Sequence, residues 1–413
     1  MLLTTPQTYR AEAFVAAAKQ AQLGIEIVQV MDMPQPLAEQ WGMRLAVDFS
    51  QPETAVSTII AFAQERPLAA IMAVDDAGAL LAAQASHALG LPHNAVTAAD
   101  AARNKYLMRQ MLAAADVASP PFRRFTMFQP KAEIAAQVAA EIGYPCVVKP
   151  LHLNGSRGVM RANNEADLHA ASARVCAMLQ NMGSEPAFLV EQFIPGVEVA
   201  LEGVLDNGRL QTLALFDKPD PLDGPFFEET IYVTPSRLPE DVQALIAETT
   251  AAGARALGLQ TGSVHAELRV NEAGTWIVEV NGRSIGGLCS QTLRFDMDMS
   301  LEELLLRQAC GLDVSSLQRE QRAGGVMMIP IPHGGILRGV RGVDAAKAVP
   351  LIDDVNITAP LNNRLVPLPE GESYLGFIFA SGDDPGVVEA ALRQAHEHLH
   401  FEIDEEIPLT LIT

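Results

Sequence analysis

The chain has 413 residues, with 29 Lys and Arg residues against 50 Asp and Glu residues, so its formal charge is −21. The composition, 49% hydrophobic and 19% charged, is that of a folded globular protein and excludes a largely disordered chain. A surface with this excess of acidic residues would repel a nucleic-acid backbone. No stretch of the sequence reaches the roughly 18 consecutive apolar residues of a membrane span. We therefore expect neither a nucleic-acid partner nor a membrane partner.

Residues 1–115 alternate short apolar runs with helical patterns, which is typical of right-handed βαβ units around a parallel sheet. The expected strands are Met1–Thr4, Ile25–Val30, Leu45–Phe49 and Ala69–Val74, and the expected helices are Arg10–Leu23, Glu53–Glu65 and Ala77–Leu89. No GxGxxG motif follows any of these strands. This Rossmann-like layer therefore lacks the fingerprint of a dinucleotide site.

A proline-containing boundary at Asp116–Pro121 separates this layer from a region of mixed α and β patterns. The expected helices there are Asn104–Ala115 and Glu133–Ile142, and the expected strands are Pro145–Lys149, Phe188–Glu191, Val197–Leu205, Ser263–Val270 and Thr275–Asn281. The last two strands, joined by Asn271–Gly274, read as an antiparallel hairpin. Beyond residue 315 we expect short β segments at Val326–Ile331 and Tyr374–Phe379 and a helix at Pro385–His398. The fold class is thus α/β and α+β, with modules at 1–115, 116–315 and 316–413.

The predicted hairpin carries the polar residues with the clearest chemical meaning. Glu279 and Asn281 are two residues apart on one strand and share a face, and the short turn places Glu267 beside Glu279 on the other strand. Two carboxylates and an amide oxygen form a hard-oxygen set that suits Mg²⁺, with Mn²⁺ as an alternative ion. Arg283 continues the row and suits phosphate or carboxylate oxygens of a substrate. The alternative interpretation is a solvated polar face of an exposed strand.

Cationic residues and a glycine loop precede this hairpin in the chain. Lys149 ends an apolar strand, and Lys105 lies four residues before Arg109 on one helix face. The loop Asn154–Gly158 offers backbone N–H groups and the Ser156 hydroxyl to phosphate oxygens. Each feature alone is also compatible with surface lysines and an ordinary turn.

The segment from Glu191 to Glu198 suits a nucleoside. Glu191 ends a strand, and the backbone groups of Gln192, Phe193 and Ile194 suit the edge of an adenine, while Glu198 suits ribose hydroxyls. An ordinary polar hairpin end is the competing interpretation.

The order of these motifs resembles the ATP-grasp superfamily over about residues 100–300. The resemblance implies a two-subdomain ATP clamp at 116–315, after an N-terminal pre-grasp domain. It also implies that Lys105 and Lys149 contact ATP phosphates, and that Ser156, Arg157 and Gly158 cover them. Glu191 would accept from the adenine amino group and Glu198 would hold the ribose. Glu267, Glu279 and Asn281 would ligate Mg²⁺, and Arg283 would steady the acyl phosphate.

Within the superfamily the chain is similar to bacterial L-amino-acid ligases, the dipeptide synthetases that include antibiotic-tailoring enzymes. The likeness lies in His265-Ala-Glu267, in Asn281–Gly287, in Phe227-Glu-Glu-Thr-Ile-Tyr232 and in a glycine- and proline-containing C-terminal domain. It implies a substrate pocket formed by Glu229, Tyr232, His265, Arg283, Gly286, Gly287 and Leu288. Asn104, Gly282 and Tyr232 depart from the family, which more often has an acid, a Pro or Ala, and a histidine at these positions.

The resemblance implies an ATP-dependent ligase that joins two amino acids, or a modified amino acid and an amino acid, through an acyl phosphate with release of ADP and phosphate. Its expected partners are ATP and amino-acid substrates. The alternatives are a purine-pathway or carboxylase-type ATP-grasp ligase and a non-catalytic ATP-binding module.

The four cysteines contain no CxxC pair, and no secretion signal is recognisable in the sequence. They predict reduced thiols, no zinc site and a cytoplasmic protein. A homodimer is the expected assembly because it is the commonest one among soluble oligomers.

Overall fold

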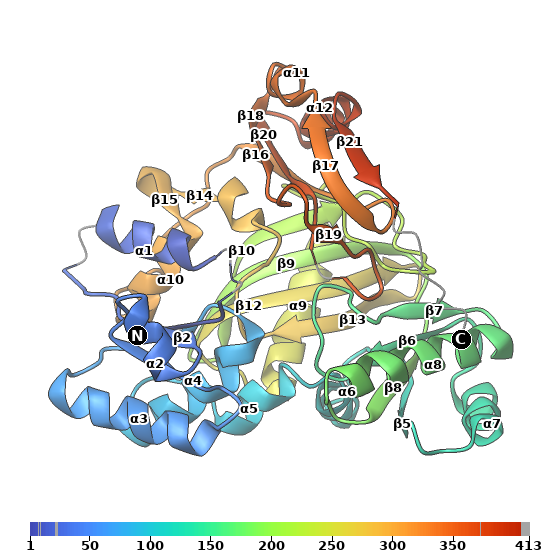
Figure 1. Cartoon of the computed structure of the whole chain (residues 1–413), viewed down its shortest axis with the longest axis horizontal. Helices are drawn as coiled ribbons and strands as arrows, with labels where there is room; N and C mark the ends of the chain where they lie inside the picture. The colour runs from blue at the N-terminus through green and yellow to red at the C-terminus, as the bar shows by residue number, and fades with distance from the viewer. Residues whose placement is uncertain (7, 9, 21–23, 372, 406–413) are drawn as a thin grey trace, which may run out of the picture.

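The computed structural model describes residues 1–6, 8, 10–20, 24–371 and 373–405 (Figure 1). Figure 1 shows the N-terminal layer at lower left, a four-stranded sheet at lower right and the C-terminal strands at the top, arranged around a larger central sheet. In the part of the chain that is described, no helix combines the length and the apolar character that crossing a membrane requires.

The N-terminal layer is a parallel sheet in the order β3-β2-β1-β4, as the alternation of strands and helices predicts. Its strands are β1 (Leu2–Thr4), β2 (Gln29–Asp32), β3 (Leu45–Val47) and β4 (Met72–Ala73). Its helices are α1 (Ala11–Gln20), α2 (Gln35–Gln40), α3 (Pro52–Glu65), α4 (Asp76–Leu89) and α5 (Val96–Ala101). Strand β2 starts later than predicted. Its first residue, Gln29, pairs with Leu2, which is the first residue of β1, so the register of the two strands begins there.

The four-stranded sheet has the order β5-β8-β6-β7, and its strands are antiparallel. The strands are β5 (Phe122–Thr126), β6 (Cys146–Pro150), β7 (Met160–Ala162) and β8 (Ala187–Gln192), with helices α7 (Lys131–Glu141) and α8 (Glu165–Asn181). Helix α6 (Lys105–Ala114) leads into it. Asn104 caps α6, since its side-chain oxygen accepts from the Tyr106 and Leu107 N–H groups at 3.0 and 3.2 Å. The unusual residue at position 104 therefore has a helix-capping role.

The central sheet has eight strands in the order β13-β12-β9-β10-β11-β16-β20-β18. These are β9 (Val197–Asp206), β10 (Arg209–Lys218), β11 (Ile231–Thr234), β12 (Gly262–Asn271), β13 (Gly274–Asn281), β16 (Ala323–Ile329), β18 (Ile352–Ile357) and β20 (Gly376–Gly382). The predicted hairpin is β12–β13. Antiparallel pairing of β11 with β16 carries the sheet across the predicted boundary at residue 316, which stays a prediction. Helices α9 (Glu240–Leu257), α10 (Leu301–Ala309) and α12 (Pro385–Glu397) accompany the sheet.

Smaller elements complete the C-terminal half. They are β14 (Arg294–Phe295), β15 (Met299–Ser300), α11 (Val343–Lys347), β17 (Gly335–Arg341), β19 (Arg364–Leu365), β21 (His400–Asp404) and the 3-10 turns Cys289–Thr292 and Asp296–Asp298. Helix α12 confirms the predicted C-terminal helix, and its inward residues Val388 and Leu392 are fully buried in a core with β16 and β20. All four cysteines are free thiols.

Candidate active site

A cavity of about 840 Å³ lies where the three parts of the chain meet. Its wall includes residues of α4, of the glycine loop, of the β12–β13 hairpin and of the segment 358–377. The predicted site residues in the wall are Lys105, Lys149, Ser156, Arg157, Glu191, Gln192, Phe193, Ile194, Glu198, Glu229, Tyr232, His265, Glu267, Glu279, Arg283, Gly286 and Gly287. Most of the site residues predicted from the sequence therefore meet in this one cavity.

Three predicted site residues lie outside the cavity wall. The Gly158 N–H donates to the Pro369 carbonyl at 2.8 Å, so it is committed to the C-terminal segment. Asn281 is only 2% exposed and lies opposite His265 in the hairpin. Leu288 is partly buried and packs against the central hydrophobic core. The contacts of these three residues with phosphate, metal or substrate stay predictions.

Glu191 lies at the centre of a buried cation pair. Arg109 Nε donates to Glu191 Oε2 at 3.0 Å, and Lys149 contacts the other oxygen. Burial opposes the charged form of Glu191, but the two cations outweigh it and lower its pKa. Arg109 also donates to the Val278 carbonyl at 2.6 Å, so it joins α6 to β13. The two carboxylate oxygens of Glu191 thus contact Lys149 and Arg109. Its contact with adenine stays a prediction.

The hairpin places two carboxylates side by side, as its short turn predicts. Glu267 and Glu279 are directly paired across β12 and β13, next to a bulge after Glu267. Lys105 Nζ lies 3.3 Å from Glu279 and donates to the Leu153 carbonyl at 2.6 Å. Burial opposes ionisation of Glu279, but Lys105 and Arg283 outweigh it and lower its pKa. Glu279 is therefore charged and poised beside a cation.

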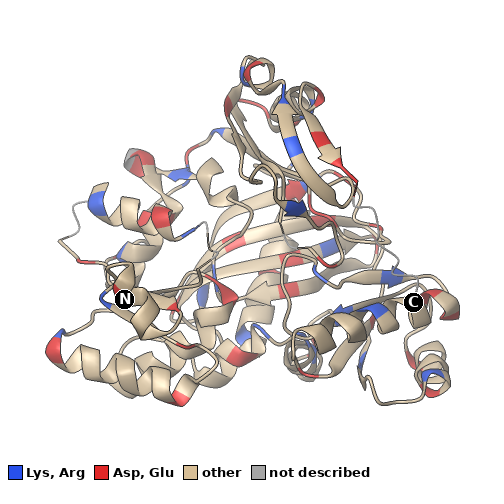
Figure 2. Cartoon of the chain, viewed as in Figure 1, with Lys and Arg blue, Asp and Glu red and all other residues tan. Residues whose placement is uncertain are grey.

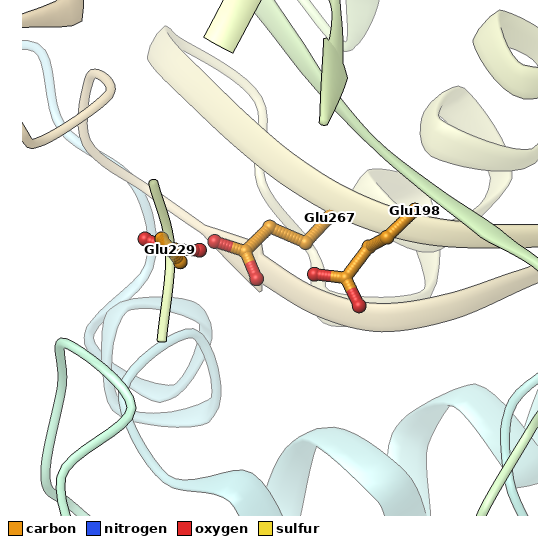
Figure 3. A group of neighbouring side chains, drawn as sticks. All are labelled: Glu198, Glu229 and Glu267. Atoms are coloured by element: carbon orange, nitrogen blue, oxygen red, sulfur yellow. The ribbon is translucent and has the colours of Figure 1, made fainter. Parts of the chain in front are cut away.

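A third lysine, Lys218 at the end of β10, contacts three carboxylates. Figure 3 shows these carboxylates, Glu198, Glu229 and Glu267. Its Nζ is 2.9 Å from Glu198, 2.7 Å from Glu229 and 3.5 Å from Glu267. Burial opposes the charged form of Lys218, but the three acids outweigh it and raise its pKa well above the usual value. Glu198 also accepts from Arg269 at 2.9 Å, and its pKa is lowered because Lys218 and Arg269 outweigh burial. Both Glu198 oxygens thus contact cations, and its contact with ribose stays a prediction.

The same carboxylates have the chemistry of a divalent-cation site. Oxygens of Glu198, Glu229 and Glu267 all lie within 4.8 Å of one another, and Glu279 adjoins Glu267 across the hairpin. Figure 3 shows Glu198 and Glu267 extending from neighbouring strands, with Glu229 facing Glu267. Burial raises the pKa of both Glu229 and Glu267, against the opposing charge of Lys218. Hard oxygen donors of this kind fit Mg²⁺.

Arg283 contacts a residue of the N-terminal layer that the sequence did not single out. Its Nε donates to Asp76 Oδ2 at 2.8 Å, and both side chains line the cavity. His265 lies between two acids, with ring nitrogens 3.4 Å from Glu202 and 3.4 Å from Glu267. Together these contacts place a buried arginine and an imidazole at the same end of the cavity as the hairpin carboxylates.

The glycine loop is held against the C-terminal segment. Gly155 and Ser156 both have positive φ angles, 58° and 56°, which form the sharp turn. Arg157 Nε donates to the Glu370 carbonyl at 3.0 Å, and the Glu370 carboxylate binds Arg174 of α8 at 2.5 and 2.7 Å. The loop therefore lies over the cavity with its far side attached to residues 369–370.

The opposite side of the cavity is mostly apolar. Its wall there includes Cys289, Met328 and Phe377, all of which are almost completely buried, together with Tyr232. A Cβ added at Gly287 would come within 2.3 Å of Met328 Sδ, whereas one added at Gly286 would meet no atom within 4 Å. Gly286 therefore borders open space and Gly287 borders a packed side chain.

Five charged residues in or beside the cavity were not predicted from the sequence. They are Lys218, Asp76, Arg10, Arg269 and Glu202. Lys218 follows the apolar run Leu213–Phe216, which is the same strand-end signal that identified Lys149. Asp76 and Arg10 lie in the N-terminal layer, more than 200 residues from their partners Arg283 and Ser284, and the sequence contained no local signal for them. Figure 2 shows acidic and basic residues together on the strands of the central sheet.

Comparisons with known proteins agree with this geometry. Residues 142–292 match an ATP-grasp domain, residues 15–93 an ATP-grasp N-terminal domain and residues 327–404 the L-amino acid ligase C-terminal domain 2. The L-amino acid ligase from Bacillus licheniformis has a similar structure, with a TM-score of 0.78 and 24% identity over 98% of both chains.

Two curated relatives share part of the chain. Alanine–anticapsin ligase of Bacillus subtilis is 28% identical over 55% of this chain and 51% of its own length. Carnosine synthase 1 of Gallus gallus is 32% identical over 50% of this chain and 23% of its own length. The chain thus spans about half or less of these relatives. The ATP-grasp fold expected from the motifs is confirmed, and the chain contains an ATP-grasp domain, an ATP-grasp N-terminal domain and an L-amino acid ligase C-terminal domain 2.

Proposed function

We propose that this protein is an ATP-dependent ligase that joins two amino acids, or a modified amino acid and an amino acid, by an amide bond. The observation that carries the proposal is the convergence of Lys105, Lys149, Arg283 and the hairpin carboxylates on one cavity, with Lys218 in contact with two residues of its wall, Glu198 and Glu229. Such an arrangement suits a nucleoside triphosphate at one end of the cavity and a carboxylic acid at the other end. The proposed site includes every predicted residue in the cavity wall.

The reaction begins when a substrate carboxylate oxygen attacks the γ-phosphorus of ATP. A new P–O bond forms, the bond to the β-phosphate oxygen breaks, and ADP leaves. Lys105 and Lys149 neutralise phosphate charge from the side of α6 and β6, and Lys218 does so from β10. Mg²⁺ held by Glu267 and Glu279, with Glu198 and Glu229 adjacent, would supply charge neutralisation of the phosphates.

In the second half of the reaction an amine attacks the carbonyl carbon of the acyl phosphate. The resulting tetrahedral carbon loses phosphate as the C–O bond breaks, and the amine proton leaves with the solvent or the phosphate. Arg283 donates to the developing oxyanion, because its guanidinium presents several fixed N–H groups at this end of the cavity. Glu229 pairs with Lys218 at 2.7 Å and is the acid nearest to a substrate ammonium in this arrangement.

The glycine loop and the segment 369–371 exclude water from the intermediate. An acyl phosphate exposed to solvent would be hydrolysed, which would waste ATP. The contacts of Gly158 and Arg157 with residues 369 and 370 keep this cover in place.

The test is an ADP-release screen over pairs of amino acids, with mass detection of the products. Amide formation that requires both members of a pair supports the proposal. ADP release with an acid that needs no amino-acid partner indicates a purine-pathway or carboxylase-type ligase, and ATP binding without turnover on any acid and amine indicates a binding module.

A pair of variants in one hairpin controls the assay. We expect Glu279→Gln to lose nearly all turnover, because it removes one carboxylate charge from the cavity. Glu272→Gln changes an exposed acid in the turn of the same hairpin and should retain turnover. Near-normal kcat of Glu279→Gln at saturating Mg²⁺ would rule out its assignment to the metal.

A further inference from the structure

The segment that follows β13 is held by three charged side chains from separate parts of the chain, of which Arg10 and Glu202 are buried and Asp76 is partly buried. Residues 283, 284 and 285 each contact one of them in turn. The contacts join Arg283 to Asp76 of α4, Ser284 to Arg10 beside α1, and Ile285 to Glu202 of β9. Because three consecutive residues each have a charged partner from a different part of the chain, the segment is held in one position.

The first contact fixes the side chain that faces the cavity. Arg283 Nε donates to Asp76 at 2.8 Å, and Arg283 also donates to the Ser284 carbonyl at 3.0 Å. Burial opposes ionisation of Asp76, but Arg283 outweighs it and lowers the pKa of Asp76. A charge-assisted hydrogen bond between two partly buried groups holds the arginine side chain in one orientation.

The second contact ties the segment to the end of the parallel sheet. Arg10, 8% exposed, donates to the Val74 carbonyl at 2.7 Å through one nitrogen and to the Ser284 hydroxyl through another. Because Val74 directly follows β4 and precedes α4, the carbonyl that Arg10 binds lies two residues before Asp76. The N-terminal layer therefore holds two successive residues of the segment.

The third contact comes from the central sheet. Glu202 is completely buried on β9, and its Oε2 accepts from the Ile285 N–H at 3.0 Å. The same carboxylate lies 3.4 Å from His265 on the neighbouring strand. Glu202 therefore fixes the backbone just before Gly286 and Gly287, which line the cavity.

We propose that Asp76 and Arg10 of the N-terminal layer, together with Glu202, are positioning residues that hold segment 283–285 in its productive orientation. The inference rests on the proposed ligase function, and it gives the N-terminal layer a part in the acyl-transfer step. Arg283 stabilises developing charge only if its N–H groups are aimed before the reaction, since reorganisation during the step would cost most of the benefit.

The test compares Asp76→Asn with Asp76→Glu in the full-length protein. Asp76→Asn keeps the shape but loses the charge, whereas Asp76→Glu keeps the carboxylate. Glu389→Gln is the matched control, because Glu389 is similarly buried and contacts Arg237 at the same 2.8 Å, outside the cavity wall. Each protein is assayed for kcat, for KM of ATP, and for amide formed per ADP released.

Loss of one charge-assisted hydrogen bond should lower kcat of Asp76→Asn about 10- to 100-fold, with KM for ATP nearly unchanged. Amide formed per ADP should also fall, because a misplaced Arg283 leaves the intermediate to hydrolysis. Asp76→Glu should recover at least part of the loss, and Glu389→Gln should match the wild type. Wild-type kcat and coupling in Asp76→Asn would overturn the inference while leaving the ligase proposal intact.

Hydrogen–deuterium exchange of segment 283–287 provides a readout that needs no turnover. The inference predicts exchange about tenfold faster in Asp76→Asn than in the wild type or in Glu389→Gln. Unchanged exchange would overturn the positioning role, even if kcat falls. If the wild type releases no ADP with any pair, the ligase proposal fails, and the exchange result alone decides whether Asp76 holds the segment.

Discussion

Replacing Lys218 with methionine should expose how the acidic cluster of the cavity is stabilised. The lysine ammonium contacts Glu198, Glu229 and Glu267 at 2.9, 2.7 and 3.5 Å, and the side chain is only 3% exposed. Methionine has a similar length but no charge. The variant therefore keeps the packing and leaves three carboxylates within 4.8 Å of one another without their shared cation.

Removing one partner of a buried ion pair typically costs about 3–5 kcal/mol, and we expect Lys218→Met to lose stability in this range near neutral pH without Mg²⁺. The pKa of Lys218 is raised, so its stabilisation is fully present below its unfolded value of 10.5 and is lost only at higher pH. Burial already raises the pKa of Glu229 and Glu267, and losing Lys218 raises both further. A carboxyl whose pKa is raised in the folded protein destabilises the fold progressively above its unfolded pKa of 4.5. The difference in unfolding free energy between the wild type and Lys218→Met should therefore shrink as the pH falls toward 4.5.

The measurement is urea unfolding followed by tryptophan fluorescence, because Trp276 lies on β13 beside this cluster. Mg²⁺ should restore more stability to Lys218→Met than to the wild type, since the ion would replace the missing charge. Lys347→Met is the control, because it removes an exposed pair with Asp354 at 2.9 Å and should cost less than about 1 kcal/mol. An unfolding midpoint of Lys218→Met equal to that of the wild type at about pH 7.5 would refute the reasoning.

Three further substitutions probe the two ends of the cavity. Lys149→Ala should weaken ATP binding and slow phosphoryl transfer, and calorimetric ATP affinity equal to that of the wild type would show that the nucleotide was misplaced. Glu229→Ala should raise KM for the first amino acid about 10-fold through loss of a charge-assisted hydrogen bond, with KM for ATP unchanged. Gly286→Leu should raise KM only for amino acids with large side chains, because an added Cβ there meets open space; an equal rise for glycine would contradict this.

The hairpin shows why part of the site was predictable from the sequence. A two-residue turn fixes the register of the hairpin, so the sequence predicts that Glu267 lies near Glu279, and the bulge after Glu267 brings the two residues into direct pairing. Lys149 was predictable for a similar reason, since a lysine after an apolar strand emerges at the strand end. Lys218 has the same pattern and was overlooked because no glycine loop follows it.

The remaining residues could not be predicted because their partners are set by the packing of separate modules. Asp76 and Arg283 are 207 residues apart, and Arg10 and Ser284 are 274 residues apart. Local periodicity predicts that each element forms but not how one layer docks on another. For the same reason, the sequence did not indicate that β16 would extend the central sheet beyond β11.

The acidic composition and the proposed anionic ligand are reconciled by the way the cavity is built. Four cations in or beside the cavity each contact a carboxylate: Lys105 contacts Glu279, Lys149 contacts Glu191, Lys218 contacts Glu198 and Glu229, and Arg283 contacts Asp76. These acids hold the cations in fixed positions. A polyphosphate therefore meets cations that are already oriented. The excess of acidic residues around the cavity thus supports the binding of an anion, because it supplies the partners that fix the few cations the site requires.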